Sequence, residues 1–73
     1  MKTYELVEVI RPIGCRTILN IKTFTNYKKA KEEFNIRVSS HNGMKQGYKS
    51  KDFCSLYNNN CVVTIGITLI NNK

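Results

Sequence analysis

The sequence predicts an α+β fold in the order β-β-α-β-β, in which four strands form an antiparallel sheet and one helix packs on one face. Three observations predict this fold. A period of two runs over 15–24, and the period lengthens to three and four residues over 27–38. A period of two returns from residue 53 to residue 70. A sheet with one helix buries its apolar side against that helix.

The first 24 residues predict a β-hairpin. Segment 3–10 is rich in β-branched and aromatic residues, which favours a strand, and Pro12 and Gly14 mark the turn that follows. A second strand is expected over 15–24. Alternation places four residues on what we expect to be its core face: Thr17, Leu19, Ile21 and Thr23. The outer face then carries the other four: Arg16, Ile18, Asn20 and Lys22.

The middle of the chain predicts an α-helix. Four residues recur at spacings of three and four and therefore share one helical stripe: Tyr27, Ala30, Phe34 and Val38. Thr25 is the expected N-cap, because its hydroxyl can accept a hydrogen bond from an unpaired N–H of the first turn. Gly43 is the expected stop, in a left-handed conformation.

The remainder predicts a loop and a second hairpin. Segment 44–52 shows no usable period and is expected to be a basic loop. Strands are expected over 53–57 and 61–70, with the last strand central because it is the longest and most apolar. A two- or four-residue turn places Cys54 and Leu56 in the core, the alternative we favour, whereas a three-residue turn places Phe53 and Tyr57 there. Residues 71–73 are expected to fray.

The composition predicts a small basic protein confined to one domain. Residues 1–73 include 12 Lys and Arg against 5 Asp and Glu, a formal charge of +7. A chain of this length forms one small core, so we expect no deep pocket enclosed by several layers. The three cysteines form no C-x-x-C pair, and no secretory signal or transmembrane run is visible. These features favour a cytoplasmic protein without a membrane partner.

The sequence offers little for catalysis or for metal binding. His41 falls at the expected end of the helix, where the helix dipole stabilises an imidazolium, and nothing places it beside Cys15. Cys54 and Cys61 are seven residues apart, unlike the close pairs that hold zinc, so we expect them to be small core residues. We therefore predict that the protein is not an enzyme and has no metal or cofactor.

A basic surface is the feature most suited to binding a partner. The positive charge is spread along the chain, without a polybasic arm. We expect the second strand and the basic loop to form one surface that suits an acidic groove, with six binding residues: Arg16, Lys22, Lys45, Tyr48, Lys49 and Lys51. Such a surface also suits phosphates, with an aromatic ring available for stacking on a base.

A second candidate surface is the face of the sheet that the helix leaves uncovered, which we expect to carry Ile18, Val62, Thr64 and Thr68. Segment 3–10 has apolar residues on both sides, with Leu6 and Ile10 on one and Val7 and Val9 on the other. A strand with two apolar faces indicates that something covers the second one, such as another copy of the chain or a target protein. We therefore expect either a homodimer or docking through that face or through a strand edge.

The stretch Thr23-Phe24-Thr25-Asn26-Tyr27, followed by Ala30, Phe34 and Leu56-Tyr57-Asn58, resembles small accessory proteins of bacteriophages. These share an F-[ST]-x-x-x-x-A-x-x-x-[FW] helix start and a later L-Y-x hairpin, and the resemblance covers 23–63. It implies a host-takeover or defence-inhibitor role without catalysis, in the cytoplasm of the host cell. The nine Asn, nine Lys and eight Ile, which have AT-rich codons, also favour a phage or mobile element.

These observations together predict a non-enzymatic binding protein. We expect it to dock on a host protein or nucleoprotein complex, such as a defence system, and to inhibit or modulate it. The alternative is direct binding of DNA or RNA by the same six residues.

Overall fold

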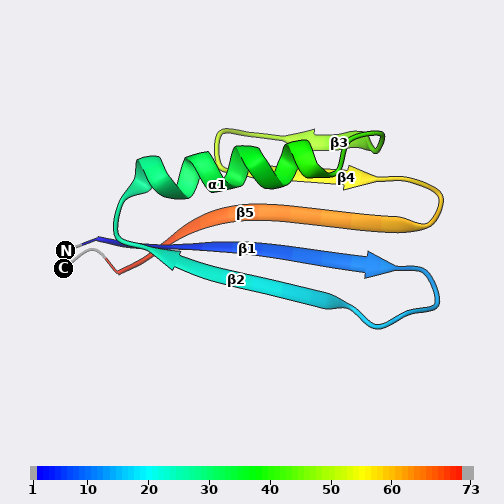
Figure 1. The fold of residues 1–73 in the computed structure, drawn as a ribbon, viewed down its shortest axis with the longest axis horizontal. Helices are drawn as coiled ribbons and strands as arrows, with labels where there is room; N and C mark the ends of the chain where they lie inside the picture. Colours follow the sequence, from blue (N-terminus) through cyan, green and yellow to red (C-terminus); the bar gives the residue numbers. More distant parts are fainter. Residues whose placement is uncertain (1, 72–73) are drawn as a thin grey trace.

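The computed structural model describes residues 2–71, which form one antiparallel sheet and one helix (Figure 1). The strand order across the sheet is β2-β1-β5-β4-β3. The α+β prediction, with one helix against an antiparallel sheet, is confirmed. The elements along the chain are β1 (Thr3–Pro12), β2 (Ile18–Phe24), α1 (Tyr27–Ser40), β3 (Lys45–Lys49), β4 (Phe53–Tyr57) and β5 (Cys61–Asn71).

The sheet has five strands, and the prediction of four was wrong. The additional strand is β3, which lies in the segment 44–52 that we expected to be a loop. It pairs with β4 from Lys45 opposite Tyr57 to Lys49 opposite Cys54, with an irregularity at Gly47. All five β3 residues are exposed, so no apolar alternation marks the strand in the sequence. Its backbone pairing, rather than side-chain burial, makes it a strand.

The last strand is central, as predicted. β5 pairs with β1 on one side and with β4 on the other. In the hairpin, Leu56 lies opposite Val63, and the N–H of Asn58 donates to the carbonyl of Cys61 at 3.0 Å. This register confirms the prediction that the even-numbered β4 residues face the core. The expected fraying does not hold for Asn71, which ends β5, and residues 72–73 lie outside the described part of the chain.

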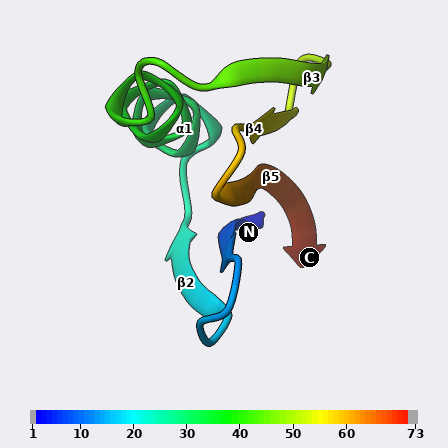
Figure 2. The same ribbon diagram turned by 90° about the vertical axis from the view of Figure 1, so that its right-hand side faces the viewer.

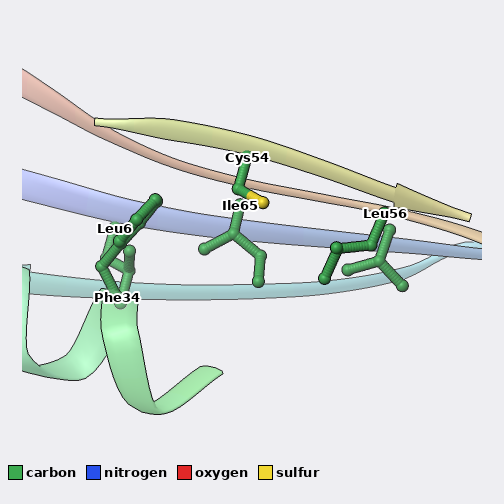
Figure 3. Close-up of a cluster of buried hydrophobic side chains, with 6 residues drawn as sticks. Leu6, Phe34, Cys54, Leu56 and Ile65 are labelled. Atoms are coloured by element: carbon green, nitrogen blue, oxygen red, sulfur yellow. The ribbon is translucent and has the colours of Figure 1, made fainter. Parts of the chain in front are cut away.

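The core lies between the sheet and α1. Figure 2 shows α1 along one side of the sheet, with no described element on the opposite side. Figure 3 shows the core side chains of the strands beside the helix that carries Phe34, with Leu6 nearest to Phe34 in this view. Burying a side chain of this size contributes roughly 1.5–3 kcal/mol. Six apolar residues make up this cluster: Leu6, Phe34, Cys54, Leu56, Val63 and Ile65.

Strand β2 presents the opposite face to the one we predicted. Directly opposite residues share a side of the sheet, and Lys22 lies opposite the buried Leu6. Even-numbered β2 residues therefore face the helix side, although we predicted them on the outer face. Leu19 and Ile21, predicted in the core, lie on the outer face with 57% and 53% exposure. The physical reason is that β2 is an edge strand with apolar residues in both phases, so alternation alone does not distinguish its two sides.

The helix follows its predicted stripe. Ala30 and Phe34 are fully buried against the sheet. Asn26, rather than the predicted Thr25, is the N-cap, and its Oδ1 accepts from the backbone N–H groups of Lys28 and Lys29. Gly43 has a φ of +96°, as predicted, but it does not stop the helix, which ends at Ser40 with His41 as its C-cap. Among residues 2–71, no helix is long and apolar enough to cross a membrane.

Candidate binding surface

The six residues that we predicted to form one surface lie at opposite edges of the sheet. Arg16 and Lys22 lie just before and within β2, whereas the other four lie in or just after β3. Strands β1, β5 and β4 separate these two edges, as Figure 2 shows. Four strand spacings amount to roughly 19 Å. The structure therefore divides the predicted surface into two, and the binding role of each half stays a prediction.

The β2 half carries a single cation within the strand. Lys22 faces the helix side, and its Nζ lies 5.3 Å from the centroid of the Phe24 ring. That contact places the ammonium over an aromatic face, an arrangement typical of a cation–π interaction. Arg16 is exposed in the segment that leads into β2. These two cations do not share the outer face, contrary to the prediction.

The β3 half is also divided between the two sides of the sheet. Lys45 and Tyr48 lie opposite Tyr57 and Ser55 and therefore share their outer side. Lys49 lies opposite the buried Cys54 and therefore points to the helix side. These positions leave one lysine and one tyrosine of the predicted set on the outer side.

Lys51, beyond the end of β3, is tied to the helix. Its Nζ lies 5.5 Å from the ring centroid of Tyr27, and its backbone carbonyl accepts a hydrogen bond from Nζ of Lys31. Tyr27 in turn donates its hydroxyl to Oδ1 of Asp52. That hydrogen bond raises the pKa of Tyr27 to about 12. Lys51 therefore has a structural role that the sequence did not indicate.

The outer side of the sheet is largely apolar, and we call it the open face. The register places three charged residues on it, Glu5, Arg11 and Lys45, of which the two cations lie towards the same end. Aliphatic and aromatic side chains from all five strands lie on it: Val7, Val9, Leu19, Ile21, Tyr48, Phe53, Tyr57 and Val62. Small residues of β4 and β5 lie among them: Ser55, Thr64, Gly66 and Thr68. Five of the aliphatic and aromatic residues are more than 40% exposed: Leu19, Ile21, Tyr48, Tyr57 and Val62.

Three aromatic rings gather on the β3 and β4 part of the open face. The ring centroids of Tyr48 and Phe53 lie 5.9 Å apart with a tilt of 48°. Glycines lie beneath two of the rings. A Cβ atom on Gly66 would lie 3.2 Å from the ring of Phe53, and one on Gly47 would lie 3.5 Å from the ring of Tyr57. The missing side chains let these rings lie close to the sheet.

The basic end of the open face is one cross-strand row. Val62 lies opposite Arg11 on one side and opposite Tyr57 on the other, and Tyr57 lies opposite Lys45. Two exposed cations thus flank a tyrosine and a valine. This arrangement can bind a surface that offers apolar contacts in its middle and negative charge at its border.

A polar cluster that the sequence analysis missed joins the helix to β1 and β2. Glu8 is 6% exposed, and its carboxylate lies 2.6 Å from Nε2 of His41 and 2.9 Å from Nη1 of Arg37. Asn20 donates to the same carboxylate at 3.2 Å, and Arg37 also bonds Glu33 at 2.9 Å. A signal was present in the sequence, because Glu8 lies in the same phase as the core residue Leu6.

The environment of Glu8 fits a structural role. Burial raises the pKa of Glu8. The hydrogen bonds with His41 and Asn20 and the charge of Arg37 together lower it by more than burial raises it, so the pKa lies below its ordinary value of 4.5. The carboxylate is therefore held in its charged form. Cys15 is exposed in the turn between β1 and β2, while His41 bonds to Glu8. The cluster links three elements rather than pairing a base with a thiol.

The remaining chemistry-bearing residues are dispersed. Cys54 is buried in the core, Cys61 packs at its border, and all three cysteines are free thiols. Across residues 2–71, no group of three or more His, Cys, Asp or Glu side chains is placed to hold a metal ion.

Comparison with known proteins finds no matching family model, no matching curated protein and no matching solved structure.

Proposed function

We propose that this chain is a non-enzymatic binding protein that docks on another protein through its open face. One observation carries the proposal: a sheet with a single helix leaves a largely apolar side without cover. Leu19 and Ile21 are more than half exposed there, and Val62 is 42% exposed. Contiguous apolar surface on a protein marks an interaction site more often than it marks a free surface. Removing such surface from water contributes roughly 25 cal/mol per Å².

The charges at the border of the open face indicate the chemistry of the partner. Arg11 and Lys45 lie at one end of the face, and the whole chain carries a formal charge of +7. A partner with an apolar patch and acidic residues beside it complements this arrangement, and the positive charge accelerates the encounter. We propose a host protein or nucleoprotein complex as the target, inhibited or modulated by occupation of that patch. The phage resemblance motivates the choice of a host target.

A second candidate function is direct binding of single-stranded DNA or RNA. The observation that favours it is the set of exposed rings of Tyr48, Phe53 and Tyr57, with Lys45 beside them. Stacking of a base on such a ring contributes about 1–3 kcal/mol. This candidate is weaker because most cations of the chain lie away from these rings. Lys28 and Lys29, for example, are exposed on the helix. Protein docking therefore stands as the first candidate.

An affinity capture with matched variants tests both candidates. The tagged chain is incubated with extract of the candidate host, with and without nuclease, and captured proteins are identified and purified. Binding of each purified protein is then measured by calorimetry to the wild type, to Val62→Asp and to Ile36→Asp. Ile36 is a suitable control because it is 61% exposed on the helix, away from the open face.

The expected result is a nuclease-resistant partner whose affinity falls at least tenfold with Val62→Asp and stays unchanged with Ile36→Asp. Equal binding by the two variants would contradict docking through the open face. Capture that disappears with nuclease, together with oligonucleotide affinity that falls steeply with salt, would support the second candidate instead.

A further inference from the structure

We propose that two copies of this chain pair through β2, antiparallel and about a twofold axis at Ile21, so that their sheets join into one. The inference concerns a strand edge rather than the open face, and it does not depend on the proposed function. It rests on a difference between the two edges of the sheet and on the order of residues within β2.

The two edge strands differ in how well they are protected against pairing. Strand β3 has five residues, its register with β4 is interrupted at Gly47, and it carries Lys45 and Lys49. Short length, irregular pairing and lysines are the devices that keep an edge from pairing with another chain. The β3 edge therefore has three such protections.

The β2 edge has few of these protections. Its seven residues pair with β1 without a break, from Phe24 opposite Tyr4 to Ile18 opposite Ile10. All of its residues except Phe24 are exposed, and Lys22 is its single charged residue. Three exposed aliphatic side chains lie along it: Ile18 at 47%, Leu19 at 57% and Ile21 at 53%. A regular apolar edge of this kind favours the addition of another strand.

Symmetry limits the register of such a pair. In an antiparallel ladder, two directly opposite residues either both direct their N–H and C=O groups towards the other strand or both direct them away from it. Two identical strands can therefore pair symmetrically only if the twofold axis passes beside a residue that lies opposite its own counterpart. An axis at Lys22 would place two ammonium groups directly opposite one another, which is unfavourable. An axis at Asn20 would pair only five of the seven residues. Ile21 is the middle residue of β2, and an axis there pairs the whole strand.

The register about Ile21 matches residues of like character at five of the seven positions, the exception being Leu19 opposite Thr23. On the helix side, Ile18 of one copy lies opposite Phe24 of the other, and Asn20 lies opposite Lys22. On the open face, Ile21 meets its own counterpart. Asn20 donates its Nδ2 to Glu8, which leaves its Oδ1 as an acceptor near the Lys22 ammonium of the second copy. The charged residue of the edge thus meets a polar partner and no like charge.

The charge of the chain opposes association at low ionic strength. Each copy carries a formal charge of +7, and repulsion between the copies is screened as salt rises. Dimerisation is therefore expected to strengthen with salt. Nucleic-acid binding has the opposite dependence, since salt weakens it.

Cysteine cross-linking of the full chain tests the register. In a Cys15→Ser background, which removes the exposed thiol, Ile21→Cys places two cysteines opposite one another, within the reach of a disulfide. Leu19→Cys is the matched control, because it has similar exposure on the same face but lies roughly 13 Å from its counterpart along the strand. We expect mild oxidation to cross-link the first variant and to leave the second as monomer, as in the Cys15→Ser parent.

Sedimentation equilibrium over a range of protein and salt concentrations tests the association itself. We expect a dimer whose dissociation constant rises at least tenfold with Ile21→Lys and is unchanged with Ile36→Lys. Where Ile21→Lys fails to fold by circular dichroism, the cross-linking result decides. A monomer at every concentration and salt level, or equal cross-linking of the two cysteine variants, would overturn the proposal. Because Ile21 also lies on the open face, loss of the dimer with Val62→Asp would overturn the proposal too, whatever the effect of Ile21→Lys, by placing the contact on that face.

Discussion

The carboxylate of Glu8 lies 2.6 Å from the imidazole Nε2 of His41, so a residue in the middle of β1 is bonded to the C-cap of α1. Arg37 lies 2.9 Å from the other oxygen of the same carboxylate. The helix is thus fixed to the sheet by polar contacts at its C-terminal end and by the packing of Ala30 and Phe34 nearer its start.

Replacing Glu8 is expected to destabilise the fold. Glu8→Gln keeps the shape but removes the charge that His41 and Arg37 share, and we expect a loss of about 1–3 kcal/mol in the free energy of unfolding. The loss stays below that of a fully buried pair, because the Arg37 and His41 side chains are each 19% exposed. Urea denaturation measures it. Glu32→Gln, on the exposed side of the helix, is the control and should have little effect.

The same carboxylate predicts how stability depends on pH. The pKa of Glu8 lies below 4.5 in the folded protein, so the folded state releases this proton more readily than the unfolded state. The stabilisation is therefore present above the unfolded pKa and is lost as the pH falls through the folded pKa. Denaturation of wild type and Glu8→Gln at several pH values should show the difference between them shrinking below about pH 4.5. A difference that stays constant would contradict the prediction.

The phenol of Tyr27 is expected to ionise at a higher pH than an ordinary tyrosine. Its hydrogen bond to Asp52 raises its pKa to about 12, so stability should fall as the pH rises from 10 towards 12, where only the unfolded phenol ionises readily. Phenol ionisation is followed by absorbance as the pH is raised. The ionisation step near pH 12 should be absent in Tyr27→Phe and should move to lower pH in Asp52→Asn. Tyr48→Phe, which removes an exposed tyrosine on the other side of the sheet, should keep it. Loss of the same step in both Phe variants would refute the assignment.

The helix cap offers a direct test of structure against sequence pattern. Asn26 accepts from two backbone N–H groups of the first turn, at 2.8 Å and 3.4 Å, so Asn26→Ala should cost about 0.5–2 kcal/mol of stability. Thr25 lies one residue earlier and makes no capping bond among those described, so Thr25→Ala should stay within about 0.5 kcal/mol. Thermal denaturation of the two variants compares them. A larger loss in Thr25→Ala would show that the helix begins one residue earlier.

The predictable parts of the fold are those whose side chains are buried in a regular pattern. Ala30 and Phe34 mark the helix, and the alternation of β5 identified the central strand, because burial selects apolar residues at a fixed period. Strand β3 was missed since none of its side chains is buried. The face of β2 was assigned wrongly because an edge strand with Leu19 on one side and Ile18 on the other has no clear core side.

The predicted surface of six residues failed to assemble for a different reason. Whether Lys22 and Lys45 lie together depends on strand order, which is a long-range property. Strand β1 lies between β2 and β5, and β3 lies at the far edge, so the two lysines are separated by three strands. Local periodicity contains no information about that order. The open face was foreseen in part, since Val7, Val9, Val62, Thr64 and Thr68 lie on it as predicted, whereas Ile18 lies on the helix side. The clustering of Phe53 and Tyr57 with Tyr48 on this face was not predicted.

The pairing of β1 with β5 has a consequence for how the protein folds. Thr3 to Pro12 lie beside Cys61 to Asn71, so the two most distant strands of the described chain are direct neighbours at the middle of the sheet. Because this pairing joins segments about sixty residues apart in the sequence, β1 and β2 can form their hairpin before β5 joins them. Closure of the sheet around β5 is therefore expected to be the slow step of folding, since pairing of distant segments costs more loop-closure entropy than pairing of near ones.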